Sequence, residues 1–186
     1  MKEIDLTGKI LVAMPGMGDP RFARSVIVIC DHGADGAMGL IVNKPAPQLD
    51  LVDLLSQLEI EHTEDLSHPV HFGGPVEAQR GFVLHTDDYA GDESSLSLPS
   101  GIRMTATLEV LRDMARGTGP ARTLVALGYA GWSPGQLEEE IADNGWLVGD
   151  ASADLIFDPE AASIWGAAIR AMGIDPRLLS GAGGRA

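Results

Sequence analysis

Short apolar runs rich in valine and isoleucine alternate along the chain with longer amphipathic stretches. Each run is bounded by polar or turn-forming residues, several of them glycine or proline, and predicts a β-strand. The predicted strands are Ile10–Met14, Val26–Cys30, Met38–Val42, Val70–Phe72, Gly81–His85 and Thr123–Leu127. Val26–Ile29 is apolar at every position, which predicts a central place in the sheet.

The amphipathic stretches predict helices with recognisable boundaries. The expected start signals are Asp50, Thr107, Ser133 and Asp158. Asp50 precedes leucines at 51, 54, 55 and 58, the spacing of one helix face behind an N-cap. Gly117 and Gly173 follow the second and the last helix, where glycine commonly ends a helix.

Predicted strands come in consecutive pairs before the first predicted helix, so strict alternation of strand and helix fails. This order predicts an α+β fold with a mixed or antiparallel sheet. The chain has 186 residues, enough for one domain with its own core, and we expect residues 1–186 to form a single domain. The Gly/Ala-rich end, residues 181–186, is expected to be a flexible tail.

Composition indicates a soluble cytoplasmic protein. Hydrophobic residues make up 45% and charged residues 22% of the chain, which is ordinary for a globular domain. No apolar run approaches bilayer length, and the N-terminus lacks the apolar core of a signal peptide. The one cysteine cannot form an internal disulfide. We therefore expect no membrane association.

The net charge of −14 limits the partners. Sequence-independent affinity for nucleic acid needs clustered lysine and arginine, so direct nucleic-acid binding is disfavoured. Arg80 is the single basic residue between positions 50 and 95. A small anionic ligand at a local positive site, or a basic partner surface, remains compatible with this charge.

Cys30 and His32 form a Cys-x-His pair where a predicted central strand ends. A neighbouring histidine, His32 or His85, could stabilise a thiolate and make Cys30 a nucleophile or a redox sensor. Lone cysteines are also commonly buried packing residues, and histidines commonly fill structural hydrogen bonds. Both interpretations remain open from the residues alone, and Cys30, His32 and His85 are the catalytic candidates.

A ligand site is the other candidate. Lys44 ends a strand with no other cation nearby in the following segment, and Arg80 stands in an acidic region. Arg80 could pair with Glu77 or with a bound anion. Glycines before it could provide unusual backbone angles or let a ligand approach the main chain. The residues predicted to bind the ligand are Asn43, Lys44, Gly73, Gly74 and Arg80.

Three motif-like stretches fail to support their usual chemistry. Residues 131–135 match the G-x-S-x-G pattern, but Pro134 lacks the N–H needed for an oxyanion hole and every histidine precedes this segment. Residues 16–21 begin like a dinucleotide fingerprint that lacks its third glycine. His68 and His71 have no recognisable zinc spacing. No cofactor and no metal is therefore predicted.

Four segments carry a family resemblance. They read DPRFARSVIVIC (19–30), GAMGLIVNKP (36–45), GGPVEAQRGFVLH (73–85) and ALGYAGWSPGQLEEEI (126–141). In this order they resemble the AlgH/YqgE family of small bacterial proteins. The resemblance implies an α+β domain with a branched mixed β-sheet, partly closed as a small barrel and surrounded by helices. The chain departs from the family at its end, where GGRA replaces a Gly-His-Ala sequence.

Members of the family have been labelled transcriptional regulators. No helix-turn-helix is apparent here, so a transcriptional effect would be indirect. The leading hypothesis is a binding or regulatory protein for a small anion or nucleotide, with one cleft that brings Cys30, His32, Asn43, Lys44, Arg80 and His85 together. The alternatives are a cysteine-dependent enzyme or redox sensor, and an indirectly acting regulator.

Overall fold

The structure, a computed structural model, describes residues 4–63, 65–66, 68–91, 93 and 95–179. Its strands are β1 (Lys9–Ala13), β2 (Val26–Gly33), β3 (Gly36–Ile41), β4 (Pro45–Asp50), β5 (Pro69–Phe72), β6 (Val76–Thr86), β7 (Leu96–Leu98), β8 (Ile102–Thr105), β9 (Thr123–Trp132) and β10 (Trp146–Asp150). Its helices are α1 (Leu51–Gln57), α2 (Leu108–Ala115), α3 (Gln136–Ala142), α4 (Ala153–Ile156) and α5 (Ala161–Ala171), with 3-10 turns η1 (Pro99–Gly101) and η2 (Pro176–Leu178).

The strands form one mixed sheet that branches at β9. The main path runs β10-β1-β2-β3-β9-β6-β8-β7, and β4 pairs with β5 off this path. The first part of β9 pairs antiparallel with β6 and parallel with β5, while Ala130–Trp132 pairs with β3. The sheet therefore curls into a half-barrel, and the predicted α+β class with a branched mixed sheet is confirmed.

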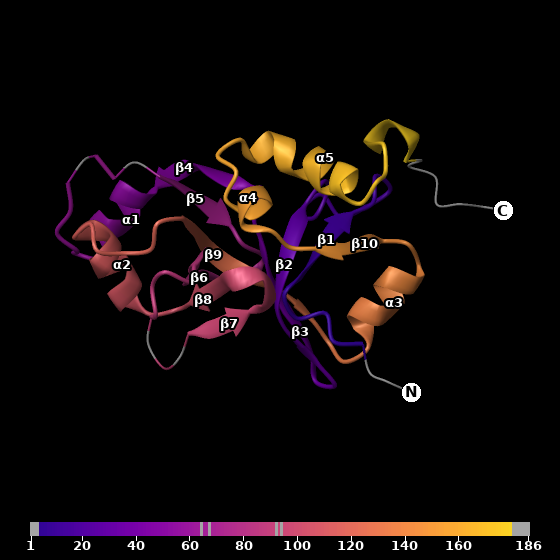
Figure 1. Cartoon of the computed structure of the whole chain (residues 1–186), viewed down its shortest axis with the longest axis horizontal. Coiled ribbons are helices and arrows are strands. Elements are labelled where there is room, and N and C mark those ends of the chain that lie inside the picture. The colour runs from indigo at the N-terminus through magenta and orange to yellow at the C-terminus, as the bar shows by residue number, and fades with distance from the viewer. Residues whose placement is uncertain (1–3, 64, 67, 92, 94, 180–186) are drawn as a thin grey trace.

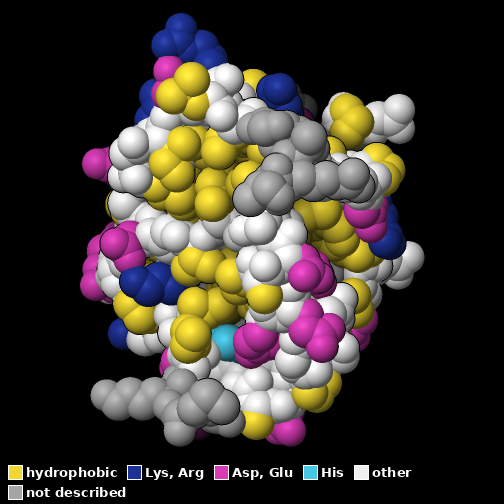
Figure 2. Space-filling model, turned by 90° about the vertical axis from the view of Figure 1, so that its right-hand side faces the viewer, with side chains coloured by type: hydrophobic (Ala, Val, Ile, Leu, Met, Phe, Trp, Pro, Cys, Tyr) yellow, Lys and Arg dark blue, Asp and Glu magenta, His cyan; other side chains and the backbone are white. Residues whose placement is uncertain are grey.

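Helices cover the sheet in two groups (Figure 1). α1 and α2 lie beside β4 to β9, whereas α3, α4 and α5 lie over the part that contains β1, β2 and β10. On the side that includes this second group, acidic side chains lie among hydrophobic ones at the surface (Figure 2). None of the helices in the described residues has the length and apolar character needed to cross a bilayer.

β2 separates two hydrophobic clusters, which confirms its predicted central place. Val26, Val28 and Cys30 pack into the first cluster, which α5 covers through residues such as Ile164. Ile27 and Ile29 of β2 pack into the second cluster with Leu137 of α3, Trp132 of β9 and Trp146 of β10. A third cluster lies between α1, α2 and strands β5, β6 and β9. Apolar burial on both faces explains why this strand is hydrophobic throughout.

Helix boundaries are partly as expected. Asp50 forms a capping box with Asp53, because each side chain accepts the other residue's backbone N–H. Thr107 occupies the N-cap of α2 but makes no capping bond with its side chain. The predicted cap at Ser133 is two residues early: α3 starts at Gln136, after a left-handed Gly135.

Strands β4, β7, β8 and β10 were not predicted from the sequence. β4 contains two prolines, and β7 is only three residues long. Proline and mostly exposed positions weaken the strand pattern, although edge or branch strands tolerate them. One domain over residues 1–186 stays a prediction, and the predicted flexible tail at residues 181–186 lies outside the described residues.

Candidate functional site

The end of β2 places Cys30 and His32 on opposite faces of the sheet. Pairing between β2 and β3 shifts register between Ile29 and Asp31, which inserts a bulge at Cys30. Cys30 therefore packs in the first cluster, while the His32 ring contacts Leu6 beside the second. In a regular strand the two side chains would share a face, so the bulge breaks the predicted Cys-x-His pair.

The Cys30 environment disfavours a thiolate. The side chain is buried, and burial followed by the charge of Asp31 raises the pKa of the thiol to about 12. Reactive cysteines need the opposite surroundings, an exposed position near positive charge. The geometry thus gives Cys30 a packing role, contrary to its candidacy as a nucleophile.

Both ring nitrogens of His32 are used structurally. Nδ1 accepts the Leu6 backbone N–H at 3.0 Å, and Nε2 lies 2.6 Å from Glu138 Oε1, to which it donates. The pKa of Glu138 is lowered first by its own backbone N–H and then by His32. His32 thereby ties the N-terminal segment to α3, and neither nitrogen is left to act as a base.

His85 is also fully engaged, on the side of β6 away from Cys30. Nδ1 donates to the Thr86 carbonyl at 2.8 Å, and Nε2 accepts from the Thr105 hydroxyl at 2.8 Å. Burial is the main cause that lowers its pKa, so the ring is neutral near pH 7. The structure does not bring His85 to Cys30.

Asn43 holds the backbone at the start of β2, and Lys44 follows it in the chain. Asn43 Oδ1 accepts the Val26 N–H at 2.9 Å, and Nδ2 donates to the Arg24 carbonyl at 2.8 Å, which holds Arg24 at a φ of 54°. Burial lowers the pKa of Lys44, against a smaller effect of nearby Asp19. Asn43 is thus a backbone cap in the fold.

Gly73 and Gly74 are required because two backbones approach closely. A Cβ at Gly73 would lie 2.3 Å from the Gly128 carbonyl oxygen, and one at Gly74 would lie 2.0 Å from the Tyr129 carbonyl carbon. The Gly73 N–H donates to the Leu127 carbonyl at 2.8 Å. The close pairing with β9 is therefore the reason for both glycines. Because β9 covers them, a ligand has no access to their backbone.

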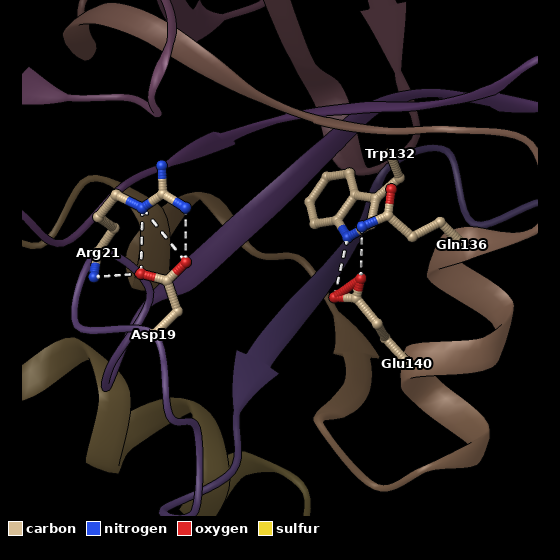
Figure 3. Close-up of polar contacts among 5 residues, drawn as sticks. All are labelled: Asp19, Arg21, Trp132, Gln136 and Glu140. Atoms are coloured by element: carbon tan, nitrogen blue, oxygen red, sulfur yellow. Dashed lines mark hydrogen bonds and ion pairs between the residues drawn. The ribbon is translucent and has the colours of Figure 1, made fainter.

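Glu140 accepts hydrogen bonds from two tryptophans that no sequence motif connects. Its Oε1 accepts the indole N–H of Trp146 at 3.1 Å. Oε1 also accepts the indole N–H of Trp132 at 3.4 Å, and Oε2 accepts from Gln136 at 3.0 Å (Figure 3). Trp132 is buried, so the Glu140 carboxylate satisfies the indole N–H of a core side chain. In the sequence, the i, i+4 spacing of Gln136 and Glu140 is the one feature that indicates a contact of Glu140.

Arg21, the basic residue of the N-terminal segment shown in Figure 3, is already paired. Its guanidinium makes hydrogen bonds to both carboxylate oxygens of Asp19, with Nη2 2.7 Å from Oδ2. Its charge also lies over the Phe22 ring, 5.7 Å from the centroid. This pair neutralises a cation that could otherwise have attracted an anion to the segment.

Arg80, by contrast, lies in an open groove of about 1000 Å³. The groove extends along the corner where β9 passes from β6 to β3, and the β2–β3 turn forms one of its walls. Its polar and aromatic lining includes Asp31, Asp35, Arg80, Phe82, Thr107 and Tyr129. Of the five residues predicted to bind a ligand, Arg80 alone lines this groove.

Local contacts hold Arg80 over an aromatic floor. Its guanidinium carbon lies 5.1 Å from the centroid of Phe82, and that ring meets Tyr129 edge to face at 5.9 Å. Nη1 is 3.4 Å from Glu77 Oε2, the carboxylate that the sequence suggested as a partner. Thr107 contributes a buried Oγ1 that has no hydrogen-bond partner in the part of the chain that the structure describes.

Metal binding finds no support at these positions. Within the described ranges, no group of three or more histidine, cysteine, aspartate or glutamate residues is arranged to hold a metal ion. The lining of the groove offers Arg80 as a cation, the partly exposed ring of Tyr129, and the carboxylates of Asp31 and Asp35 for recognition.

A curled, branched α+β sheet with an aromatic groove at its corner defines the class of protein. Residues 10–177 match the family model described as AlgH-like (DUF179), and the chain belongs to this family. It is 58% identical over 185 residues to a UPF0301 protein from Ruegeria pomeroyi, covering 98% of this chain and 100% of that one. A UPF0301 protein from a Methylobacterium species is 54% identical, with 97% and 90% covered.

Solved structures agree with this assignment. The solution structure of the AlgH protein from Pseudomonas aeruginosa matches with a TM-score of 0.79 and 38% identity, over 100% of both chains. A crystal structure of protein DIP2367 from Corynebacterium diphtheriae matches with a TM-score of 0.74 and 23% identity, over 92% and 89%, and shows the likeness of fold alone.

Proposed function

We propose that this protein binds a small anionic ligand of the nucleotide class in the groove at Arg80, and that it works in the cytoplasm. The observation that carries the proposal is an exposed guanidinium held above Phe82 in a groove of about 1000 Å³. A groove of this size can enclose a nucleotide-sized molecule.

Arg80 is available to an anion at little cost. Its pair with Glu77 is long, at 3.4 Å, and the two side chains are 55% and 53% exposed. Exposed pairs of this kind contribute about 0–1 kcal/mol, so a phosphate can displace Glu77. The planar guanidinium can then bind two phosphate oxygens side by side.

The rest of the groove supplies complementary groups. Tyr129 is partly exposed and offers an aromatic ring on which a planar base can stack, while the buried Phe82 supports Arg80 from below. Thr107 provides a hydroxyl without a partner among the described residues, and Asp31 and Asp35 can accept hydrogen bonds from amino or hydroxyl groups. A nucleotide carries a phosphate, a base and hydroxyls, and so can use all of these groups.

A regulatory role would follow from ligand occupancy. The net charge of −14 opposes contact with duplex DNA, whereas one local cation suits a small anion. Any effect on transcription would therefore pass through a partner that senses whether the groove is filled.

The test is a calorimetric and NMR titration with AMP, adenosine and inorganic phosphate. We expect AMP to bind with amide shifts at residues 31–38 and 129–132, and Arg80→Glu to weaken it at least roughly tenfold, the loss of a charge-assisted contact. Arg177→Glu is the matched control, because Arg177 also pairs with a neighbouring carboxylate but is 89% exposed on η2.

Circular dichroism must show that Arg80→Glu stays folded. If AMP does not bind at millimolar concentration, or binds Arg80→Glu as tightly as the unchanged protein, the groove is not a nucleotide site. Equal binding of adenosine and AMP would also contradict the role given to Arg80.

A further inference from the structure

A second hollow, of about 490 Å³, lies away from the groove. One wall is the sheet face that carries His71 of β5 and Leu124 of β9, and the other is the end of α4 at Ile156 with Phe157 of the α4–α5 connection. The turn that leads from α2 into β9 closes one side and brings Arg122 to the hollow. The groove uses the other end of β9, so the two spaces have separate linings.

His71 is the unusual member of this lining. Its side chain sits within the sheet with 8% exposure, and Nδ1 has no hydrogen-bond partner among the described residues. The other buried histidines differ, since His32 and His85 use both ring nitrogens. A buried polar atom without a partner is rare in a folded protein and points to a bound group.

The missing partner is a small polar group. Burial lowers the pKa of His71, so the ring is neutral near pH 7. The Val125 backbone raises this pKa by a smaller amount. Nδ1 itself has no partner among the described residues, and in a neutral ring with its proton on Nε2 it can accept a hydrogen bond from a hydroxyl.

The surroundings of His71 define the rest of the ligand. Leu124 and Phe157 line the hollow with apolar side chains suited to a ring. Arg122 Nη1 lies 2.7 Å from Asp154 Oδ1, but the two side chains are 49% and 89% exposed. Such a surface pair is weak, so the guanidinium can turn to a carboxylate in the hollow.

We propose that this hollow is a binding site for a small aromatic carboxylic acid that carries a hydroxyl group. The hydroxyl donates to His71 Nδ1, the ring packs between Leu124 and Phe157, and the carboxylate pairs with Arg122. This site is independent of the nucleotide groove and does not rest on it.

The test is an NMR titration of the full chain with three probes, followed through backbone amides and the His71 ring. The probes are 4-hydroxyphenylacetate, phenylacetate, which lacks the hydroxyl, and 4-hydroxybenzyl alcohol, which lacks the carboxylate. We expect 4-hydroxyphenylacetate to shift residues 69–71 and 117–125, and each truncated probe to bind at least roughly tenfold more weakly.

Variants separate recognition from folding. His71→Phe keeps an aromatic ring but removes the acceptor, and should abolish the preference for the hydroxylated probe. Arg122→Gln should abolish the preference for the carboxylate. Arg116→Gln is the matched control, because Arg116 is an exposed arginine paired with Asp113 outside this hollow. If His71→Phe fails to fold, the comparison of probes and Arg122→Gln still decide the matter.

The proposal is overturned if 4-hydroxyphenylacetate and phenylacetate bind equally well, or if neither binds at 10 mM. It is also overturned if the shifts fall only on residues 31–38 and 129–132, which belong to the other groove.

Discussion

The two parts of the sheet use polar side chains differently. Around β1, β2 and β3, the side chains of Asn43 and His32 use all their hydrogen-bonding groups within the fold. Asn43 bonds to backbone atoms, and His32 bonds to the backbone and to α3. Around β5 to β9, two buried polar atoms, His71 Nδ1 and Thr107 Oγ1, have no partner among the described residues. Both of these residues line hollows. A dense group of reactive residues in the sequence can therefore mark the parts that hold the fold together, while the two proposed binding sites lie elsewhere.

The largest expected effect is at the seam between these two parts. Gly74→Ala would place a Cβ 2.0 Å from the Tyr129 carbonyl carbon, which backbone movement alone can relieve. We expect a loss of about 3 kcal/mol or more, or failure to fold, measured by urea unfolding. Gly18→Ala is the control, because a Cβ there meets nothing within 4 Å. Normal stability of Gly74→Ala would contradict the close approach of the two backbones as the reason for this glycine.

The next largest effect concerns the Cys30 thiol, in the part of the sheet around β1, β2 and β3. A pKa raised from 9.0 to about 12 lowers the thiolate fraction of Cys30 roughly a thousandfold. We expect a thiol reagent to label the folded protein at least that much more slowly than the protein in denaturant, across pH 6 to 9. Fast labelling with a midpoint below the ordinary thiol range would restore Cys30 as a nucleophile or redox sensor.

A smaller loss of stability is expected at Asn43, in the part of the sheet around β1, β2 and β3. Asn43→Ala removes the acceptor of the Val26 N–H, which is buried, and should cost about 1–3 kcal/mol in urea unfolding. Asn43→Asp keeps that acceptor but puts a carboxylate oxygen against the Arg24 carbonyl oxygen, which repels it, so it should also destabilise the fold. Normal stability of Asn43→Ala would contradict the capping role of this side chain.

The smallest effect is a dependence of stability on pH in the second part. Burial lowers the pKa of both His71 and His85 in the folded state. These histidines bind protons more readily in the unfolded chain than in the folded protein. Their contribution to the free energy of unfolding is therefore complete above the histidine pKa of the unfolded chain, about 6.5, and is lost as the pH falls below that pKa. Unfolding free energy should drop between pH 7.5 and 5.5. The drop should shrink in His71→Phe and persist in His68→Gln, a change at an exposed position.

Much of the fold could be predicted from local patterns. The uninterrupted apolar run at Val26–Ile29 predicted a central strand, which the structure places between two hydrophobic clusters. Asp50 before its leucine stripe predicted a helix cap. The pairing of Arg80 with Glu77 also followed from their spacing. These features depend on neighbours in the chain, which a single sequence displays.

The candidate site could not be predicted in the same way. The bulge at Cys30 depends on the pairing of β2 with β3, and it separates two side chains that ordinary strand periodicity places together. Gly73 and Gly74 are required by backbone atoms of β9, which lie more than fifty residues away in the sequence. His71 was considered only as a metal ligand, because its unpartnered nitrogen follows from tertiary burial.

The position of β9 in the chain also has a consequence during synthesis. β3, β5 and β6 all pair with this one strand, which ends at Trp132, and each of them leaves the ribosome before it. Until β9 emerges, their facing edges present unpaired N–H and C=O groups, the kind of surface that attracts other chains. The nascent protein therefore has to wait for its last third before the sheet closes, and ribosome-stalled chains that end before residue 123 should be protease-sensitive and prone to aggregate.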